Sequence, residues 1–148
     1  MKGTILYAEY DEGTGVSVVT KSTKYGTFTR SVRVHPDDED IANQYDGCLF
    51  AEMKCDIAAY KEKAKFLYQR ALGVRHAINV LYQADKQSEY VTLDSNIIDL
   101  LQRQEENAFK LANNAHETYT ILRDSYKALI ENNLRTRREI RTRVKRDY

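Results

Sequence analysis

The 148-residue sequence contains no tryptophan, only one proline and only two cysteines. It also lacks the run of about 18 apolar residues that a membrane-spanning helix requires. Cys48 and Cys55 lie seven residues apart, and in a helix this spacing separates their Cα atoms by about 10 Å, too far for a disulfide. We therefore expect two reduced thiols, no secretory leader and a cytoplasmic protein.

Residue patterns that support catalysis are also absent. The sequence has no HExxH, no paired-cysteine zinc pattern, no GxSxG and no phosphate-binding GxxxxGK[ST]. Its histidines, His35, His76 and His116, lie far apart. We predict a non-enzymatic protein with no catalytic residue, no cofactor and no metal.

One acidic segment leaves a metal site open as an alternative. His35 and Pro36 precede four consecutive acids, Asp37 to Asp40, and carboxylates with an imidazole can bind divalent ions. Adjacent acids diverge around a helix, however, and Asp37 suits the cap of a helix whose first turn favours negative charge. Helix capping is the preferred interpretation.

The charges are unevenly distributed, although the net charge is only +1. Residues 134–148 contain seven basic side chains and two acidic ones, whereas the rest of the chain contains sixteen basic and twenty acidic side chains. This pattern indicates a mildly acidic body with a basic C-terminal extension.

The N-terminal region has the pattern of β-strands. "TILYAEY" (4–10), "VSVVT" (16–20) and "TFTRSVRV" (27–34) are rich in β-branched and aromatic residues, and glycine-containing turns separate them. We predict a three-stranded antiparallel β-meander as a head over residues 1–36. A sheet this small needs a cover, which the following helices must supply.

The remainder, residues 37–148, has helical periodicity. We predict a short helix over 37–46 and long helices over 47–85 and 94–146, with Thr92 or Asp94 as the cap of the last. The connection between the long helices is short enough for an antiparallel coiled-coil hairpin. The fold class is therefore α+β, mostly α. Gly73 is a weak point of the first long helix and would admit the backbone of a partner.

Apolar residues repeat at alternating steps of three and four in both long helices, as in a coiled-coil seam. In the second helix, Ala112, Tyr119 and Tyr126 widen the stripe on one side. A two-helix hairpin leaves part of such a stripe exposed, so we expect a homo-oligomer, a dimer or higher. The predicted hairpin or oligomer seam consists of Phe50, Met53, Ile57, Tyr60, Leu67, Val74, Ile78, Leu81, Leu101, Leu111 and Leu122.

The basic extension is the candidate ligand site. Its cations could contact several phosphates and make binding steeply dependent on salt. They could instead complement a helix C-terminus or pair with acidic groups of the head or of a second subunit. The candidate contacts are Arg135, Arg137, Arg138, Arg141, Arg143, Lys145 and Arg146.

Residues 34–57 carry a motif: a strand, then His-Pro-Asp-Asp (35–38), then Gly47, Phe50, Ala51 and Glu52 at the start of a helix. In this the chain resembles a group of small uncharacterised proteins encoded by phages and prophages of low-GC Gram-positive bacteria. The resemblance implies an accessory gene of a mobile element. In outline, a sheet followed by two long helices also resembles phage proteins that sequester immune signal nucleotides.

Three functions follow as expectations. The first is an accessory protein of a phage or mobile element that binds and inhibits a host protein or nucleoprotein complex, in the manner of a counter-defence protein. It would act in the cytoplasm of an infected or lysogenic bacterial host. The second is nucleic-acid binding through the basic extension. The third is sequestration of a signal nucleotide at a subunit interface by arginines and tyrosines.

Overall fold

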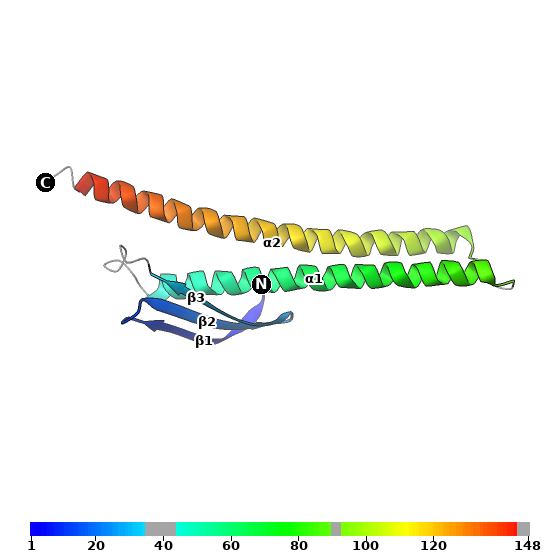
Figure 1. The fold of residues 1–148 in the computed structure, drawn as a ribbon, viewed down its shortest axis with the longest axis horizontal. Helices are drawn as coiled ribbons and strands as arrows, with labels where there is room; N and C mark the ends of the chain where they lie inside the picture. The colour runs from blue at the N-terminus through cyan, green and yellow to red at the C-terminus, as the bar shows by residue number, and fades with distance from the viewer. Residues whose placement is uncertain (35–43, 90–92, 145–148) are drawn as a thin grey trace.

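The computed structural model describes residues 1–34, 44–89 and 93–144, with side chains as far as residue 132. These residues form a three-stranded antiparallel sheet followed by two long helices, as the sequence predicts. The elements lie in three layers, with the sheet on one side of the first helix and the second helix on the other (Figure 1). Their bounds are β1 Gly3–Asp11, β2 Val16–Thr23, β3 Gly26–Arg33, α1 Gln44–Gln87 and α2 Ser95–Val144.

The strands follow the order β1-β2-β3, so β2 is central and the other two are edge strands. Asp11 organises the first turn, because its carboxylate accepts hydrogen bonds from the Gly13 amide at 2.9 Å and the Thr14 hydroxyl at 2.7 Å. These two bonds lower the pKa of Asp11. Gly15 in this turn has a φ of 64° and Gly26 in the next has a φ of 137°, conformations that glycine adopts without strain.

The two faces of the sheet differ in burial. Along β2, Ser17, Val19 and Lys21 are buried because alternate side chains point toward α1. In β1, by contrast, all residues but one are exposed. The β1–β2 register shifts between Ile5 and Tyr7, which marks a β-bulge. The helix therefore covers β2 and leaves β1 overhanging.

The core of the sheet layer is small. Val19 of β2 packs against Ala51 and Cys55 of α1, which are fully buried, and Phe28 and Val32 of β3 surround them. Small residues on α1 let the helix axis approach the sheet closely. This contact holds the sheet along the N-terminal part of α1, so the sheet lies alongside the hairpin.

The helical hairpin has its own seam, in which α1 contributes Ala64, Ala71 and Ile78, and α2 contributes Ala112, Ala115 and Tyr126. Aromatic pairs cross it at two levels: Phe50 stacks edge-on against Tyr126 with centroids 6.2 Å apart, and Tyr68 against Phe109 at 6.0 Å. Arg75 adds an ion pair to Glu105. In the described part of the chain α2 contacts α1 and no strand.

The predicted seam differs from the hairpin seam at one residue of each helix. Ile78 is buried, and the other predicted members are half-buried, except two. Leu81 and Leu111 are 46% and 58% exposed, so they lie outside the hairpin seam. The side that Ala112, Tyr119 and Tyr126 were expected merely to widen is the side that faces α1. The assignment of Leu81 and Leu111 to a seam between chains stays a prediction.

The helix boundaries also differ in part from the predicted ones. Residues 44–46 belong to α1, so Gly47 lies in the first turns of this helix and is not a junction between two helices. Residues 37–43 of the predicted short helix lie outside the described residues, as does Thr92. Asp94 caps α2 as predicted, since its carboxylate accepts a hydrogen bond from the Ile97 amide at 2.8 Å.

Candidate functional site: an apolar groove beside a buried charge cluster

The predicted phosphate-binding extension begins on α2. This helix continues to Val144, and Figure 1 shows its C-terminal end projecting past the start of α1 and past the sheet. Five candidate arginines lie on this part of α2, but their side chains are outside the described ones. Lys145 and Arg146 lie outside the described residues altogether. Phosphate contact by the extension therefore stays a prediction.

The alternative metal site at His35 and Asp37 to Asp40 likewise lies outside the described residues. Among residues 1–34, 44–89 and 93–144, no group of three or more histidine, cysteine or acidic side chains is placed to hold a metal ion. In the same ranges no helix is long and apolar enough to cross a bilayer.

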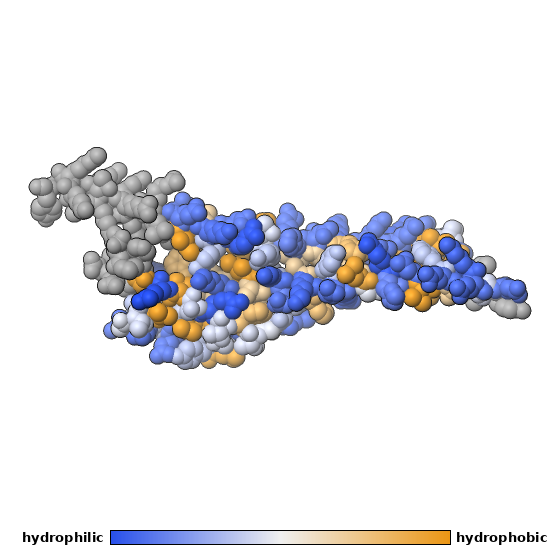
Figure 2. Space-filling model, viewed as in Figure 1, coloured by the Kyte–Doolittle hydropathy of each residue, from blue (hydrophilic) through white to orange (hydrophobic). Residues whose placement is uncertain are grey.

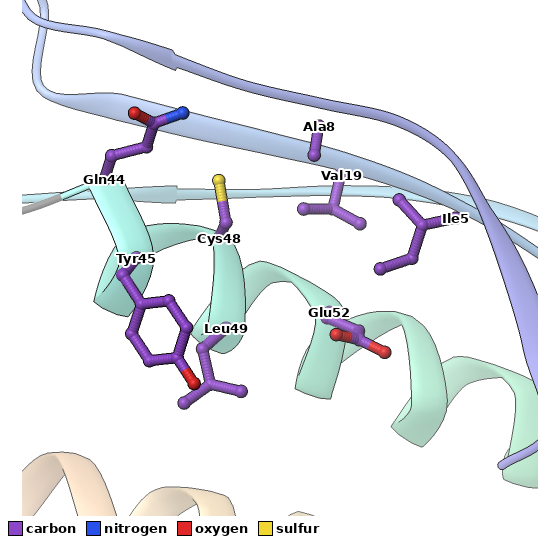
Figure 3. A pocket seen from close by; sticks show the side chains of 8 residues that line it. All are labelled: Ile5, Ala8, Val19, Gln44, Tyr45, Cys48, Leu49 and Glu52. Carbon is purple, nitrogen blue, oxygen red and sulfur yellow. The ribbon is translucent and has the colours of Figure 1, made fainter.

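The structure does bring together a site that the sequence did not predict. A groove of about 870 Å³ opens between the overhanging strand β1, the central strand β2 and the first turns of α1 (Figure 3). Its lining is mostly apolar, with one carboxylate at one end. The lining residues are Ile5, Ala8, Val19, Gln44, Tyr45, Cys48, Leu49 and Glu52.

The groove exists because α1 is centred on β2 and β3, beyond which β1 extends uncovered. Ile5, Tyr45 and Leu49 are exposed to 46%, 77% and 43% and lie together in the lining of the groove, so they form one apolar patch. Figure 2 shows apolar side chains gathered at the end of the molecule where the sheet meets the start of α1. An exposed apolar surface rimmed by polar groups is typical of a binding site.

A buried charge cluster lies beside the groove. Lys21 of β2 is almost fully buried, and its ammonium group lies 2.7 Å from Glu52 Oε1 and 2.9 Å from Asp56 Oδ1. The α-amino group of Met1 lies 3.2 Å from the other Asp56 oxygen. Burial alone would lower the pKa of Lys21, but the hydrogen bonds and charges of the two carboxylates outweigh it and raise this pKa. Lys21 therefore stays charged as an internal tie between β2 and α1.

Neither cysteine is placed for nucleophilic chemistry within the described residues. Cys55 is fully buried and its thiol donates to the carbonyl oxygens of Val19 at 3.4 Å and Phe28 at 3.3 Å. Burial raises the pKa of Cys55, which keeps the thiol protonated and unreactive. Cys48 is half-buried and lines the groove. Both thiols are free, as the sequence predicts.

The described part of the phage-type motif has a structural explanation. Gly47 sits so close to β2 that a Cβ atom there would lie 2.0 Å from Ser17 Oγ. Ala51 is fully buried on the sheet and Glu52 pairs with Lys21. Phe50 points to the other side of α1 and packs on Tyr126. The glycine, alanine and glutamate thus dock α1 on the sheet, and the aromatic residue docks it on α2.

A second hollow, of about 610 Å³, lies between the helices, and cations and aromatic rings contribute to its lining. Lys61, Lys65 and Tyr68 of α1 face His116 and Tyr119 of α2 across it. Such groups can contact a phosphate and stack on a base. The hypothesis of nucleotide sequestration places arginines and tyrosines at a subunit interface, whereas this hollow lies within one chain and no arginine is among its described lining residues, so that hypothesis stays a prediction.

No family model, no curated protein and no solved structure matches this chain.

One signal in the sequence could have located the groove and its charge cluster. In "VSVVTKST", Lys21 occupies the same alternating face as Ser17 and Val19, so a lysine had to point inward. Glu52 and Asp56 are four residues apart and share one face of a helix. An inward lysine needs acidic partners, and this acidic pair could supply them, which would place α1 over β2. The residues "TIL" of β1 would then lie beyond the part of the sheet that the helix covers.

Proposed function

We propose that this chain is a non-enzymatic accessory protein of a phage or other mobile element that binds a host macromolecule and inhibits it by covering a functional surface. The observation that carries the proposal is the open apolar groove under the uncovered strand β1. Its exposed Ile5, Tyr45 and Leu49 form a surface that gains free energy when a partner removes it from water.

The geometry favours a protein partner over a small molecule. The groove is open, and β1 is an edge strand with no second partner strand among the described residues, so an extended segment of a partner could add to it as a further strand. Apolar side chains of that segment would enter the groove and a basic side chain would meet Glu52. The resemblance of residues 34–57 to phage-encoded proteins supports the mobile-element origin, and a protein of that kind would act in the cytoplasm of an infected or lysogenic host.

Capture from a host lysate tests this proposal when groove and control variants are compared. We expect Ile5→Lys combined with Leu49→Lys to lose the captured host protein, because two cations would be forced into the apolar lining. Leu6→Lys is the matched control, since Leu6 is 61% exposed on the same strand but does not line the groove. Inhibition of the captured partner's activity by the wild-type chain, and not by the double variant, completes the test.

Equal capture by all three chains, or capture that fails only in the Leu6→Lys variant, would contradict the proposal. Circular dichroism of each variant shows whether the fold is retained. If the wild-type chain captures no specific host protein, the proposal loses its support and the second candidate function is favoured.

The second candidate function is nucleic-acid binding through the basic extension. It is favoured by the course of α2, which carries residues 133–144 as a helix beyond the acidic body. Fluorescence anisotropy of a labelled duplex and a labelled single strand tests it, with the full chain and a chain ending at Asn133, at several salt concentrations. Binding by the full chain only, with affinity falling steeply as salt rises, would establish phosphate contacts.

A further inference from the structure

Helix α2 carries a second periodic surface that does not face α1. From Ile97 to Ala128, ten positions reached by alternate steps of three and four residues hold no charged side chain. Four of these are large apolar residues, Ile97, Leu100, Leu111 and Ile121, and the others are alanine or uncharged polar residues. We call this surface the α2 stripe. The rest of the solvent-exposed surface of α2 is rich in charged residues, so the absence of charge is specific to this face.

The α2 stripe is exposed in the single chain. Leu100, Leu111 and Ile121 are exposed to 56%, 58% and 58%. The stripe lies beside the seam with α1, rotated by roughly 100° around the helix. This is the angle at which a helix of a four-helix bundle meets its second neighbour. The sheet does not obstruct it, because the sheet covers the opposite side of α1 (Figure 1).

Charges along one edge of the stripe identify the partner. Seven-residue steps along this edge give Arg103, Lys110, Glu117 and Asp124. Two cations are thus followed by two anions along the middle of the stripe. Such flanking residues set partner choice and orientation in coiled coils. The order plus, plus, minus, minus is complementary to itself when it is read in the reverse direction. A second copy of the same helix running antiparallel therefore supplies the matching charges.

Stripe and charges require the same register. In the antiparallel alignment that places Ile97 opposite the partner's Ala128, Leu111 falls opposite the partner's Asn114. In the same alignment the flanking side chains meet two residues beyond the position directly opposite, so Arg103 lies nearest to the partner's Asp124 and Lys110 to the partner's Glu117. The two-fold axis then passes between residues 111 and 114, and each ion pair occurs twice. Two independent patterns in the sequence thus give one arrangement.

A parallel pair lacks this agreement. In a parallel coiled coil, Arg103 and Lys110 would approach the partner's Ala108 and Ala115, and those positions carry no charge and pack toward α1. In the antiparallel pair these inner positions stay on the side of α1, and both α1 helices lie together. Asp124 already pairs with its neighbour Arg123 at 2.9 Å, but both side chains are exposed and a carboxylate can accept further bonds.

We propose that the α2 stripe is the interface of an antiparallel homodimer, in which two hairpins form a four-helix bundle with a sheet near each end. The proposal does not depend on the host partner or on the groove, whose described lining contains no residue of α2. It assigns a role to Leu111, which the hairpin seam leaves in solvent. It also commits to one register and one orientation.

Sedimentation equilibrium of the full chain tests the proposal. We expect a dimer, and a dissociation constant raised at least about 100-fold by Leu111→Asp, because two carboxylates would meet beside the two-fold axis. Asn114→Asp should weaken the dimer, whereas the same change one residue earlier, Asn113→Asp, lies off the stripe and should not. Circular dichroism at the same concentrations separates loss of the dimer from loss of the helix.

A charge swap tests the orientation. Lys110→Glu alone and Glu117→Lys alone should each weaken the dimer about tenfold, since each creates two like-charge pairs. The double variant should return to within about threefold of wild type, because the opposite charges face each other again. A monomer at all concentrations, a dimer unaffected by Leu111→Asp, or a double variant weaker than both single ones would each overturn the proposal.

Discussion

Two glycines interrupt α1, and their surroundings show that the two halves of this helix are stabilised differently. A Cβ atom at Gly47 would meet Ser17 on the sheet, whereas a Cβ atom at Gly73 would have no described atom within 4 Å apart from its own helix. The N-terminal half lies between sheet and α2, with buried residues on both sides. Beyond Phe66, whose ring contacts Tyr25 at the end of the sheet, the C-terminal half packs on α2 and leaves Val80 and Leu81 exposed.

The comparison explains where the molecule is sensitive to change. On the sheet side, α1 is held by small buried residues, a close backbone approach and a buried ion cluster. Each of these contacts is lost if a larger or differently charged side chain is introduced. Beyond the sheet, it is held by a helical seam that tolerates substitution more readily. At Gly73 no described atom outside its own helix lies within 4 Å of the Cβ position. The predicted approach of a partner backbone at this glycine therefore stays a prediction.

The largest expected effect comes from removing the cation that ties the sheet to the helix. Lys21→Met leaves Glu52 and Asp56 as partly buried carboxylates without their shared partner, and should lower the free energy of unfolding by about 3 kcal/mol. Lys54→Met is the matched control, because Lys54 bonds to the Ser31 carbonyl at 3.0 Å from an exposed position and should cost less than about 1 kcal/mol. Urea denaturation measures both, and equal losses would show that the buried cluster is not the main tie.

The two glycines give a second prediction with opposite signs. Gly47→Ala should lower the free energy of unfolding by about 1–2 kcal/mol, since the crowding against Ser17 outweighs the better helix propensity of alanine. Gly73→Ala should raise it by roughly 0.5–1 kcal/mol, because only the propensity term remains. Thermal or urea unfolding of both variants measures the contrast.

Ser17 provides the control for Gly47. Its hydroxyl is buried and has no hydrogen-bond partner among the described residues, so Ser17→Ala alone should cost little. In the double variant Gly47→Ala with Ser17→Ala, most of the lost stability should return. A double variant as unstable as Gly47→Ala would show that the backbone of β2, and not the Ser17 side chain, limits the approach.

The smallest expected effect concerns pH. Burial raises the pKa of Cys55 and of Tyr126, and the two carboxylates raise the pKa of Lys21. A raised pKa in the folded state means that the associated stability is complete below the unfolded pKa and is lost as pH rises through the folded one. We therefore expect stability to be constant from pH 7 to about pH 8.5, the ordinary pKa of a thiol, and to fall above it.

Cys55→Ser separates the thiol from the other two groups. Serine retains a hydrogen-bond donor toward Val19 and Phe28 but does not titrate in this range. The decline in stability should therefore begin nearer pH 10, where tyrosine and lysine begin to lose their protons in the unfolded chain while Tyr126 and Lys21 keep theirs in the folded one. The urea midpoint, measured from pH 7 to pH 10.5, shows whether the onset moves. An unchanged onset would mean that Cys55 makes no contribution.

Much of the architecture could be predicted from local pattern. The alternation of β2, the glycines of the two turns, the cap at Asp94 and the 3-4 rhythm of both helices gave the strands, the helices and their order. The position of the basic residues gave a charged end to α2. These features depend on residues near one another in the chain, where propensity and periodicity act directly.

Other features could not be resolved locally. Two stripes of α2 share Leu101, Ala108, Ala115 and Leu122, and one adds Leu111 while the other adds Ala112 and Tyr119. Both have the period of a coiled coil, and only contact with the alanines of α1 selects the second. The groove could not be located from any single segment either, because the inward Lys21 and its acidic partners lie on different elements and the groove results from where a 44-residue helix is centred on a sheet.

The sequence by itself determined the elements, their order, the free thiols and the segregation of charge, since each follows from composition or from spacing along the chain. Only the tertiary structure decided which side of α2 faces α1, that Lys21 is neutralised by Glu52 and Asp56, and that β1 is left uncovered. These depend on long-range packing between segments, where the fit of small residues at Gly47, Ala51 and Cys55 sets the position of one layer on another.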